Sequence, residues 1–240
     1  MRTELLLGSD AMERLHNAHV MICGVGAVGG FAAEMIARAG VGTITLVDFD
    51  RVESTNINRQ LVAMQSTIGE LKTQIMAARI RDINPECHVN LIEEKITADN
   101  VIPLLGGVAR SAGEGLIVID AIDDAVAKTA LIATAIDMSV KIISSMGAGM
   151  RTDLASIKVS TIAKTVQCPL ARRIRKNLKK ISACTNVICV YSDAPIPDSV
   201  HDARDMATRD AGARTLPSMS TMTASVGIRV ADETIKQIVL

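Results

Sequence analysis

The chain has 240 residues, of which 48% are hydrophobic, so it can bury a sizeable core and intrinsic disorder is excluded. Its 26 basic and 26 acidic side chains give a formal net charge of zero. No global field therefore attracts nucleic acid or a membrane, and any such contact must use a local patch of charge.

Short β-rich runs alternate with helical patterns along the chain. In order they are VMIC, TITLVDF, HVNLI, GLIVID and KIISS, followed by IKVSTI and VICVYS in the last third. This alternation predicts an α/β fold: a Rossmann-like, doubly wound, mainly parallel sheet with a C-terminal α+β extension. We expect the first domain to cover 1–150 and the extension to cover 151–240, continuous with the same domain.

A glycine-rich stretch, MICGVGAVGG, connects the first predicted strand to the helix that follows it. Gly24, Gly26 and Gly29 have the GxGxxG spacing, in which the first glycine permits a tight turn, the second admits an anion and the third packs closely. Free backbone N–H groups and the helix dipole make such a loop a phosphate site. The motif alone fits a dinucleotide, a nucleoside triphosphate or a glycine turn without a ligand.

The second predicted strand ends in LVDFD, which places Asp48 and Asp50 roughly 20 residues beyond the glycines. A carboxylate at that strand end accepts hydrogen bonds from ribose hydroxyls. A nucleotide is therefore predicted, although NAD and ATP both carry this ribose.

Polar and basic residues follow in RVESTNINRQ and IGELKTQ. A site that stabilises a departing pyrophosphate needs cations such as Arg59 and Lys72, whereas hydride transfer has no need of two cations beside the phosphates. Asn56, Asn58 and Gln60 offer neutral hydrogen bonds nearby. Either cation alone fits a solvated surface residue, but together with the glycine loop and the strand-end carboxylate they favour a triphosphate.

A third predicted strand ends in acidic residues, in VIDAIDDAVAK. Asp120 and Asp123 then lie at the carboxyl edge of the sheet, where ligands bind in folds of this class. Asp123 is placed to hold Mg²⁺ on a triphosphate, because that ion takes one or two carboxylates together with phosphate oxygens. The alternative is that Asp120, Asp123 and Asp124 cap the following helix.

The stretch PLARRIRKNLKK predicts a helix with a broad cationic face. Leu170, Ile174 and Leu178 form its apolar stripe. The cations are Arg172, Arg173, Arg175, Lys176, Lys179 and Lys180. A solvated helix surface explains many charge runs, but one so one-sided in a neutral protein favours contact with nucleic-acid phosphates.

The five cysteines form no CxxC pair, and their odd number fits reduced thiols in a cytoplasmic protein. No run reaches the roughly 20 apolar residues that span a bilayer, so we expect no membrane contact. Cys168 has no neighbouring histidine or helix start to lower its pKa, so we interpret it as a small buried thiol rather than a thioester nucleophile. The histidines lack metal spacing and are expected at surface or helix positions.

The motifs GVGAVGG, LVDFD, TNINRQ, GELK and DAID, in this order, resemble the adenylating domain of the ubiquitin-activating-enzyme-like superfamily over roughly residues 2–150. Further along, ISSMGAG, AKTVQCPLARRIRKNLKK, VYS and GARTLPSMSTMTASVG are similar to the bacterial branch of tRNA threonylcarbamoyladenosine dehydratases. The resemblance thus extends over nearly the whole chain.

This resemblance implies ATP-dependent cyclisation of the threonylcarbamoyl group on adenosine 37 of tRNA, through an acyl-adenylate. It implies ATP and Mg²⁺ as cofactors and makes 1–150 the ATP-binding adenylation domain. With a tRNA substrate, the one-sided charge of the basic helix favours that helix as the tRNA contact. The implied nucleotide-site residues are Gly24, Gly26, Ala27 and Gly29 at the phosphates, Asp48 at the ribose, Asp50, Asn56, Asn58 and Gln60 beside them, Arg59 and Lys72 at the pyrophosphate, and Asp123 at the magnesium.

Arg2 matches an arginine that family members extend into the ATP site of the neighbouring subunit. The resemblance therefore implies a homodimer, with Arg2, Arg59, Lys72 and Asp123 as catalytic residues. It also leaves open sulfur-transfer partners such as a cysteine desulfurase.

Three other functions stay open from the sequence. The first is adenylation of the C-terminal carboxylate of a ubiquitin-like sulfur carrier, against which the missing CxxC pairs of a zinc site argue. The second is a nucleotide-binding scaffold in sulfur transfer that has no turnover. The third is an NAD-dependent oxidoreductase, which the paired cations disfavour.

Overall fold

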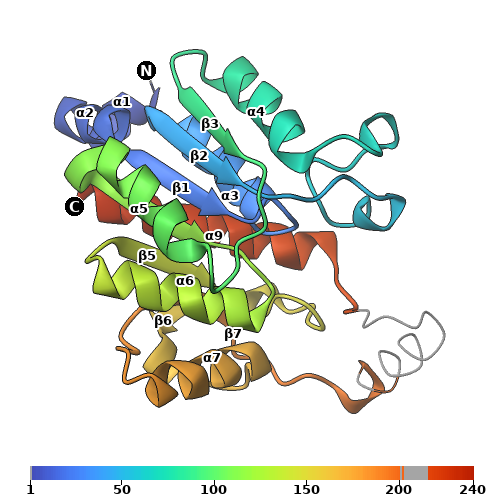
Figure 1. The fold of residues 1–240 in the computed structure, drawn as a ribbon. Coiled ribbons are helices and arrows are strands. Elements are labelled where there is room, and N and C mark those ends of the chain that lie inside the picture. The colour runs from blue at the N-terminus through green and yellow to red at the C-terminus, as the bar shows by residue number, and fades with distance from the viewer. Residues whose placement is uncertain (1, 201, 203–215) are drawn as a thin grey trace.

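The structure, a computed structural model, describes residues 2–200, 202 and 216–240. A seven-stranded sheet lies between two layers of helices (Figure 1). The strands are β1 (His19–Cys23), β2 (Thr43–Val47), β3 (His88–Ile92), β4 (Leu116–Asp120), β5 (Lys141–Ser145), β6 (Ile157–Thr161) and β7 (Ile188–Ser192). The helices are α1 (Arg2–Leu7), α2 (Ser9–Asn17), α3 (Gly29–Ala39), α4 (Lys72–Ile83), α5 (Val101–Ala112), α6 (Ala125–Asp137), α7 (Pro169–Lys180) and α9 (Ser220–Val239).

The strand order is β3-β2-β1-β4-β5-β7-β6. All neighbouring strands run parallel except β6 and β7, which pair antiparallel at one edge. From β1, the next strands in sequence, β2 and β3, lie on one side, and β4 lies on the other side. The direction in which successive strands are added to the sheet therefore reverses beside β1. The predicted doubly wound α/β fold with a C-terminal extension is confirmed.

Apolar side chains on alternating strand positions feed two cores, one on each face of the sheet. Ile22 and Ile44 pack towards α3, α4 and α9, whereas Met21 and Val118 pack towards α5, α6 and α7. Burial on both faces explains why the central strands are nearly continuous hydrophobic runs.

The last helix, α9, connects the end of the chain to the first half of the fold. Its 20 residues cross the sheet face beside α3, β5 and β7. Gly227 lies so close to α3 that an added Cβ would collide with the carbonyl oxygen of Val28. No helix among the described residues combines the length and the apolar composition needed to cross a bilayer. The domain boundary at residue 150 stays a prediction, although one sheet runs through both halves.

Two local expectations differ from the structure. The spacing of Ile68, Leu71, Ile75 and Ile80 in the sequence predicts a helical stripe that starts at Ile68. The helix α4 begins only at Lys72, because Gly69 adopts a left-handed φ of 90° and interrupts the pattern. The expected surface or helix position of His19 is wrong, since this residue begins β1 and is buried. His201 lies outside the described residues.

Candidate active site

The glycine loop follows β1 at the point where the strand order reverses, which is where ligands bind in sheets of this kind. Gly24 has a φ of 92°, and an added Cβ would lie 2.8 Å from the carbonyl oxygen of Ala121. An added Cβ at Gly29, the first residue of α3, would collide with the carbonyl oxygen of Gly24. Only glycine fits at both positions, and α3 points its free N–H groups into the loop.

Asp48 fixes this loop to the end of β2. The carboxylate is buried, and its Oδ2 accepts a hydrogen bond of 2.6 Å from the backbone N–H of Val25. Its Oδ1 accepts one of 2.9 Å from the N–H of Asp50. Because each carboxylate oxygen has a second lone pair, Asp48 can also accept hydrogen bonds from ribose hydroxyls.

Lys72 supplies a buried cation beside the same strand end. Its Nζ lies 2.8 Å from Oδ2 of Asp50, and its backbone N–H donates to the Asp50 carbonyl. The Lys72 side chain is almost fully buried, whereas that of Asp50 is half-exposed. The lysine is thus held by the chain before any phosphate arrives, which reduces the ordering cost of binding.

The segment between β2 and α4 orders its polar residues through internal hydrogen bonds. Asn56 ends a short 3-10 helix, η1 (Ser54–Asn56), and its Oδ1 accepts from the N–H of Glu53, the N-cap residue. Arg59 donates through Nη1 to the Thr55 carbonyl at 2.9 Å and to Oδ1 of Asn58 at 2.8 Å. The guanidinium keeps its other N–H donors for an anion.

Gln60 carries an unsatisfied polar atom at the glycine loop. Its Oε1 is buried and has no hydrogen-bond partner among the described residues. Its Nε2 is 3.9 Å from where a Cβ of Gly26 would be, an ordinary van der Waals distance. The side chain of Asn58 donates to the carbonyl of Ser218, just before α9. A buried acceptor without a partner beside the glycine loop is what a bound polar ligand would complete.

The three aspartates after β4 have different surroundings. Asp124 is the N-cap of α6, with Oδ1 accepting from the N–H groups of Val126 and Ala127. Asp120 is fully buried and pairs with Lys128. Asp123 is exposed and makes no hydrogen bond or ion pair with a described residue. The helix-cap alternative therefore applies to Asp124, whereas no residue in the described part of the chain engages the carboxylate of Asp123.

Helix α7 buries Ala171, Ile174 and Leu178, as its apolar pattern indicates. Five of its six cations are exposed, namely Arg172, Arg173, Lys176, Lys179 and Lys180. Arg175 departs from the expected face. It is partly buried, and its Nη1 donates to the carbonyls of Ile162 and Thr165 and to the Thr165 hydroxyl. Arg175 therefore fixes the segment before α7.

The sequence profile of the ThiF family matches residues 1–239. The chain belongs to the ThiF family. It is 42% identical over 177 residues to the tRNA threonylcarbamoyladenosine dehydratase of Escherichia coli K12, covering 74% of this chain and 64% of that protein. The Bacillus subtilis protein of the same name is 41% identical over 193 residues, covering 80% and 73%.

A solved structure of Escherichia coli tRNA N6-threonylcarbamoyladenosine dehydratase, TcdA, in complex with ATP is also similar. The TM-score is 0.84 at 34% identity, and the match covers 99% of this chain and 92% of the other. In sequence, the chain spans somewhat less than two thirds of the length of the Escherichia coli relative, 64%.

In this ThiF-family chain, Cys168 is buried, with 3% of its surface exposed. Contrary to the absence of a helix start expected from sequence, Cys168 is the N-cap of α7, and its Sγ accepts from the N–H of Ala171 at 3.5 Å. Burial raises the pKa of Cys87 to about 11 and that of Cys189 to about 12, so both stay protonated at neutral pH.

Arg2 lies far from the glycine loop of its own subunit. It begins α1, and α2 leads directly into the start of β1, whereas the loop follows the end of β1 (Figure 1). A five-residue strand separates these edges by about 16 Å. Helix α1 buries no residue, and Leu5 and Leu6 are 89% and 83% exposed.

Two supporting residues of the site escape sequence reasoning. Gly227 lets α9 approach the loop residue Val28, and a lone glycine within the helical pattern ASVGIRVADE is the signal that indicates such close packing. Arg151 is buried and donates to the carbonyls of Gly149 and Gln167, which fixes the end of the ISSMGAG segment. No local pattern indicates that role. Residues 212–215 of the GARTLPSMSTMTASVG motif lie outside the described residues.

Proposed function

We propose that this chain is an ATP-dependent dehydratase that cyclises the threonylcarbamoyl group on adenosine 37 of tRNA. The observation that carries the proposal is the similarity, over 99% of the chain, to a protein titled tRNA N6-threonylcarbamoyladenosine dehydratase in complex with ATP. The glycine loop, Asp48 and Lys72 supply the phosphate and ribose contacts that such a reaction requires.

The reaction has two steps. A carboxylate oxygen of the threonylcarbamoyl group attacks the α-phosphate of ATP, and the bond to pyrophosphate breaks. A nitrogen of the ureido group then attacks the acyl carbon, AMP leaves with the former carboxylate oxygen, and the nitrogen loses its proton to solvent. The ring closes with net loss of one water, and no protein side chain forms a covalent bond. Positioning and electrostatic stabilisation therefore supply the catalysis.

The residues present fit ATP. Gly24 and Gly29 allow a loop so tight that an added Cβ would collide with backbone oxygens, and the buried Oε1 of Gln60 lacks a hydrogen-bond partner among the described residues. The positive charges of Arg59 and Lys72 stabilise the negative charge that develops on the leaving pyrophosphate. Asp48 orients the ribose. The backbone N–H of Ala27 serves as well as that of a glycine, because no side chain is used.

The exposed carboxylate of Asp123, which no described residue engages, fits Mg²⁺, since this hard cation prefers carboxylate and phosphate oxygens. When bound, the ion would neutralise charge on the triphosphate. Asp123 belongs to the turn after β4, next to the glycine loop, and the chain therefore presents one acidic ligand where the phosphates are expected.

The five exposed cations of α7 are the proposed tRNA contact. With few aromatic residues in the chain, 1%, recognition must depend on charge and shape more than on stacked bases. Arg175 is left out of this surface because its guanidinium is occupied by backbone carbonyls. A tRNA substrate also supports a cytoplasmic location in this proposal.

A homodimer completes the site in this proposal. Arg2 lies at the edge of the sheet opposite the glycine loop. It can therefore act at a nucleotide only in another subunit. The exposed Leu5 and Leu6 give α1 an apolar surface that it can bury against that subunit. Binding of a cysteine desulfurase stays a prediction from the family resemblance.

The comparisons favour the dehydratase over the three alternatives. The Escherichia coli and Bacillus subtilis relatives are named dehydratases, and ATP, not NAD, is the nucleotide in the similar structure. The described residues contain no group of three or more His, Cys, Asp or Glu placed to hold a metal, and a zinc site accompanies many sulfur-carrier activators.

The test is a single-turnover reaction of purified protein with ATP, Mg²⁺ and tRNA bearing threonylcarbamoyladenosine. The expected result is a nucleoside lighter by one water, with AMP and pyrophosphate formed in equal amounts. The matched arm replaces the tRNA by a ubiquitin-like sulfur carrier. Pyrophosphate release with the carrier but not the tRNA would establish the alternative substrate, and ATP binding without either reaction would establish a scaffold.

A further inference from the structure

A closed polar cluster lies in the core where β4 and β5 end. Lys128 of α6 and Asp120 of β4 both have 0% of their side-chain surface exposed, and Nζ lies 2.7 Å from Oδ2. The same ammonium donates to the Ser145 carbonyl at 2.9 Å and to Oγ of Ser144 at 3.3 Å. The hydroxyl of Ser144 donates to Oδ2 of Asp120 at 2.5 Å.

Such a buried ion pair contributes little net stability. Removing two charges from water costs several kcal/mol per ion, and replacing a buried pair by apolar residues of similar volume is often neutral or stabilising. The cluster is also surrounded by apolar side chains of the core that faces α5, α6 and α7. Stability alone therefore gives no reason for three polar side chains at this point.

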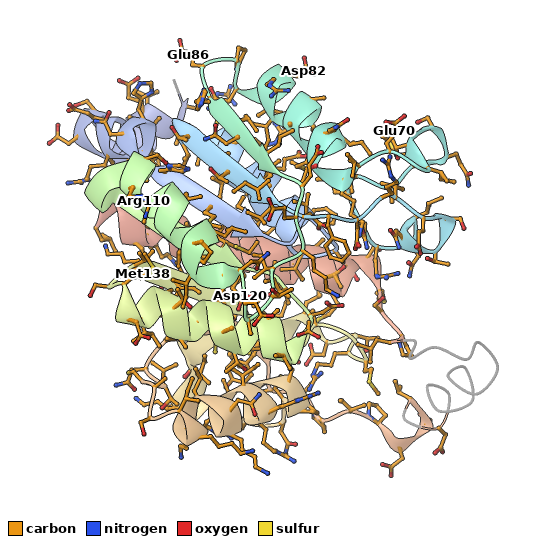
Figure 2. The ribbon with its side chains drawn as sticks, viewed as in Figure 1. Glu70, Asp82, Glu86, Arg110, Asp120 and Met138 are labelled. Atoms are coloured by element: carbon orange, nitrogen blue, oxygen red, sulfur yellow. The ribbon has the colours of Figure 1, made fainter. Side chains whose placement is uncertain are left out.

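The cluster is joined to the glycine loop through the turn that follows β4. The second carboxylate oxygen of Asp120 accepts a hydrogen bond of 3.2 Å from the N–H of Ile122. Between them, Ala121 donates to the carbonyl of Cys23 at 2.8 Å, and its own carbonyl oxygen packs against Gly24. Asp123 is the next residue of the turn. Asp120, labelled in Figure 2, is the last residue of β4.

We propose that Asp120, Lys128 and Ser144 are positioning residues of the nucleotide site. They fix the backbone conformation of residues 120–123. This backbone packs against Gly24 and positions Asp123 towards the bound triphosphate. The inference rests on the proposed function only for the identity of the nucleotide. None of the three side chains touches the ligand, so they act through the turn and the loop.

The informative variant is the double substitution Asp120→Asn with Lys128→Met. It removes both charges together, because a single substitution would leave one buried charge unpaired and threaten the fold. Ser144→Ala is a milder companion that removes one hydroxyl and no charge. Arg79→Met is the control, since it breaks another ion pair, to Glu34 between α3 and α4, away from the turn.

Three quantities are measured on each folded variant: the thermal midpoint, the ATP affinity by calorimetry with and without Mg²⁺, and amide hydrogen exchange over 24–27 and 121–124. We expect the double variant to bind ATP about tenfold more weakly, to gain less affinity from Mg²⁺, and to exchange faster in both segments. Ser144→Ala should shift the same quantities in the same direction by less. Arg79→Met should lower the thermal midpoint alone.

Unchanged ATP affinity, Mg²⁺ gain and exchange in the double variant would overturn the proposal, whatever its thermal midpoint. If the double variant does not fold, the same readouts on Ser144→Ala decide. Wild-type protein that binds ATP but does not convert modified tRNA would refute the dehydratase proposal and leave this one standing.

Discussion

At the residue scale, the proposed nucleotide site combines positions that the sequence indicates with positions that only the fold reveals. Gly24 and Gly29 could be predicted, because their spacing reflects a steric need that is local to one turn. The pairing of Asp120 with Lys128 could not, because the two residues meet through the packing of α6 on the sheet. The same holds for Arg175, whose backbone partners lie in the segment before its helix.

Removing either cation of the proposed pyrophosphate site should slow the adenylation step. Arg59→Ala and Lys72→Ala should each lower kcat/KM for pyrophosphate release by the equivalent of about 2.7–4 kcal/mol, the effect of losing one oxyanion donor. Arg81→Ala, on the exposed side of α4, is the control and should stay near wild type. Near-normal kcat/KM in both variants would remove Arg59 and Lys72 from the catalytic set.

The buried histidine of β1 makes the stability of the fold depend on pH. Nε2 of His19 lies 2.8 Å from the Thr45 hydroxyl, and burial, together with the neighbouring His88, lowers the pKa of His19 below its usual 6.5. Between the lowered folded pKa and 6.5 the unfolded chain binds more protons, so this contribution is full above pH 6.5 and is lost as the pH falls.

Urea unfolding of the wild type and of His19→Gln at pH 7.5 and pH 5 tests this effect. We expect the wild type to lose more free energy of unfolding on acidification than the variant, by about 1.4 kcal/mol for each unit of pKa depression. All other titrating groups are common to both proteins. Equal losses in the two proteins would show that His19 does not titrate differently in the folded state.

At the scale of elements, the sequence predicts strands better than helix starts and edges. The five-residue strands coincide with apolar runs because both faces of the sheet are covered. The apolar spacing places the start of α4 too early, because Ile68 and Leu71 fit the helical pattern. The left-handed backbone of Gly69 prevents a helix before Lys72. The cationic pattern of α7 predicts an exposed face, and tertiary contacts then remove Arg175 from it.

Reversing charge on the exposed face of α7 should weaken tRNA binding and leave ATP binding unchanged. Arg172→Glu combined with Lys176→Glu should raise KM for modified tRNA and reduce the slope of log KM against log salt by about one to two. Arg81→Glu combined with Arg110→Glu imposes the same change of charge on α4 and α5 and serves as the control. An unchanged salt slope in the α7 variant would place the tRNA elsewhere.

At the scale of the whole molecule, the alternation of strands and helices suffices to predict the layered sheet. The alternation does not predict that β6 and β7 form an antiparallel edge. It also does not predict that α9 packs against Val28, beside the glycine loop. Those features depend on contacts between distant parts of the chain, for which one sequence contains no local signal. The position of Arg2 at the opposite edge is likewise a property of the complete fold.

Complementation tests whether the site is shared between two subunits. Arg2→Ala and Lys72→Ala are each expected to be inactive, but a heterodimer of the two contains one intact site. After equal amounts are unfolded and refolded together, random pairing should restore about a quarter of wild-type activity. Activity that stays at the average of the separate variants would contradict a role for Arg2 in the partner's site.

The central claim is that the threonylcarbamoyl carboxylate is activated as an acyl-adenylate at the glycine loop. The most direct measurement is a single turnover with modified tRNA whose carboxylate oxygens are labelled with ¹⁸O, followed by mass analysis of the nucleotide products. The account predicts AMP that carries one labelled oxygen, formed together with unlabelled pyrophosphate and the cyclised nucleoside. Label in inorganic phosphate released with ADP, or AMP without label, would contradict it.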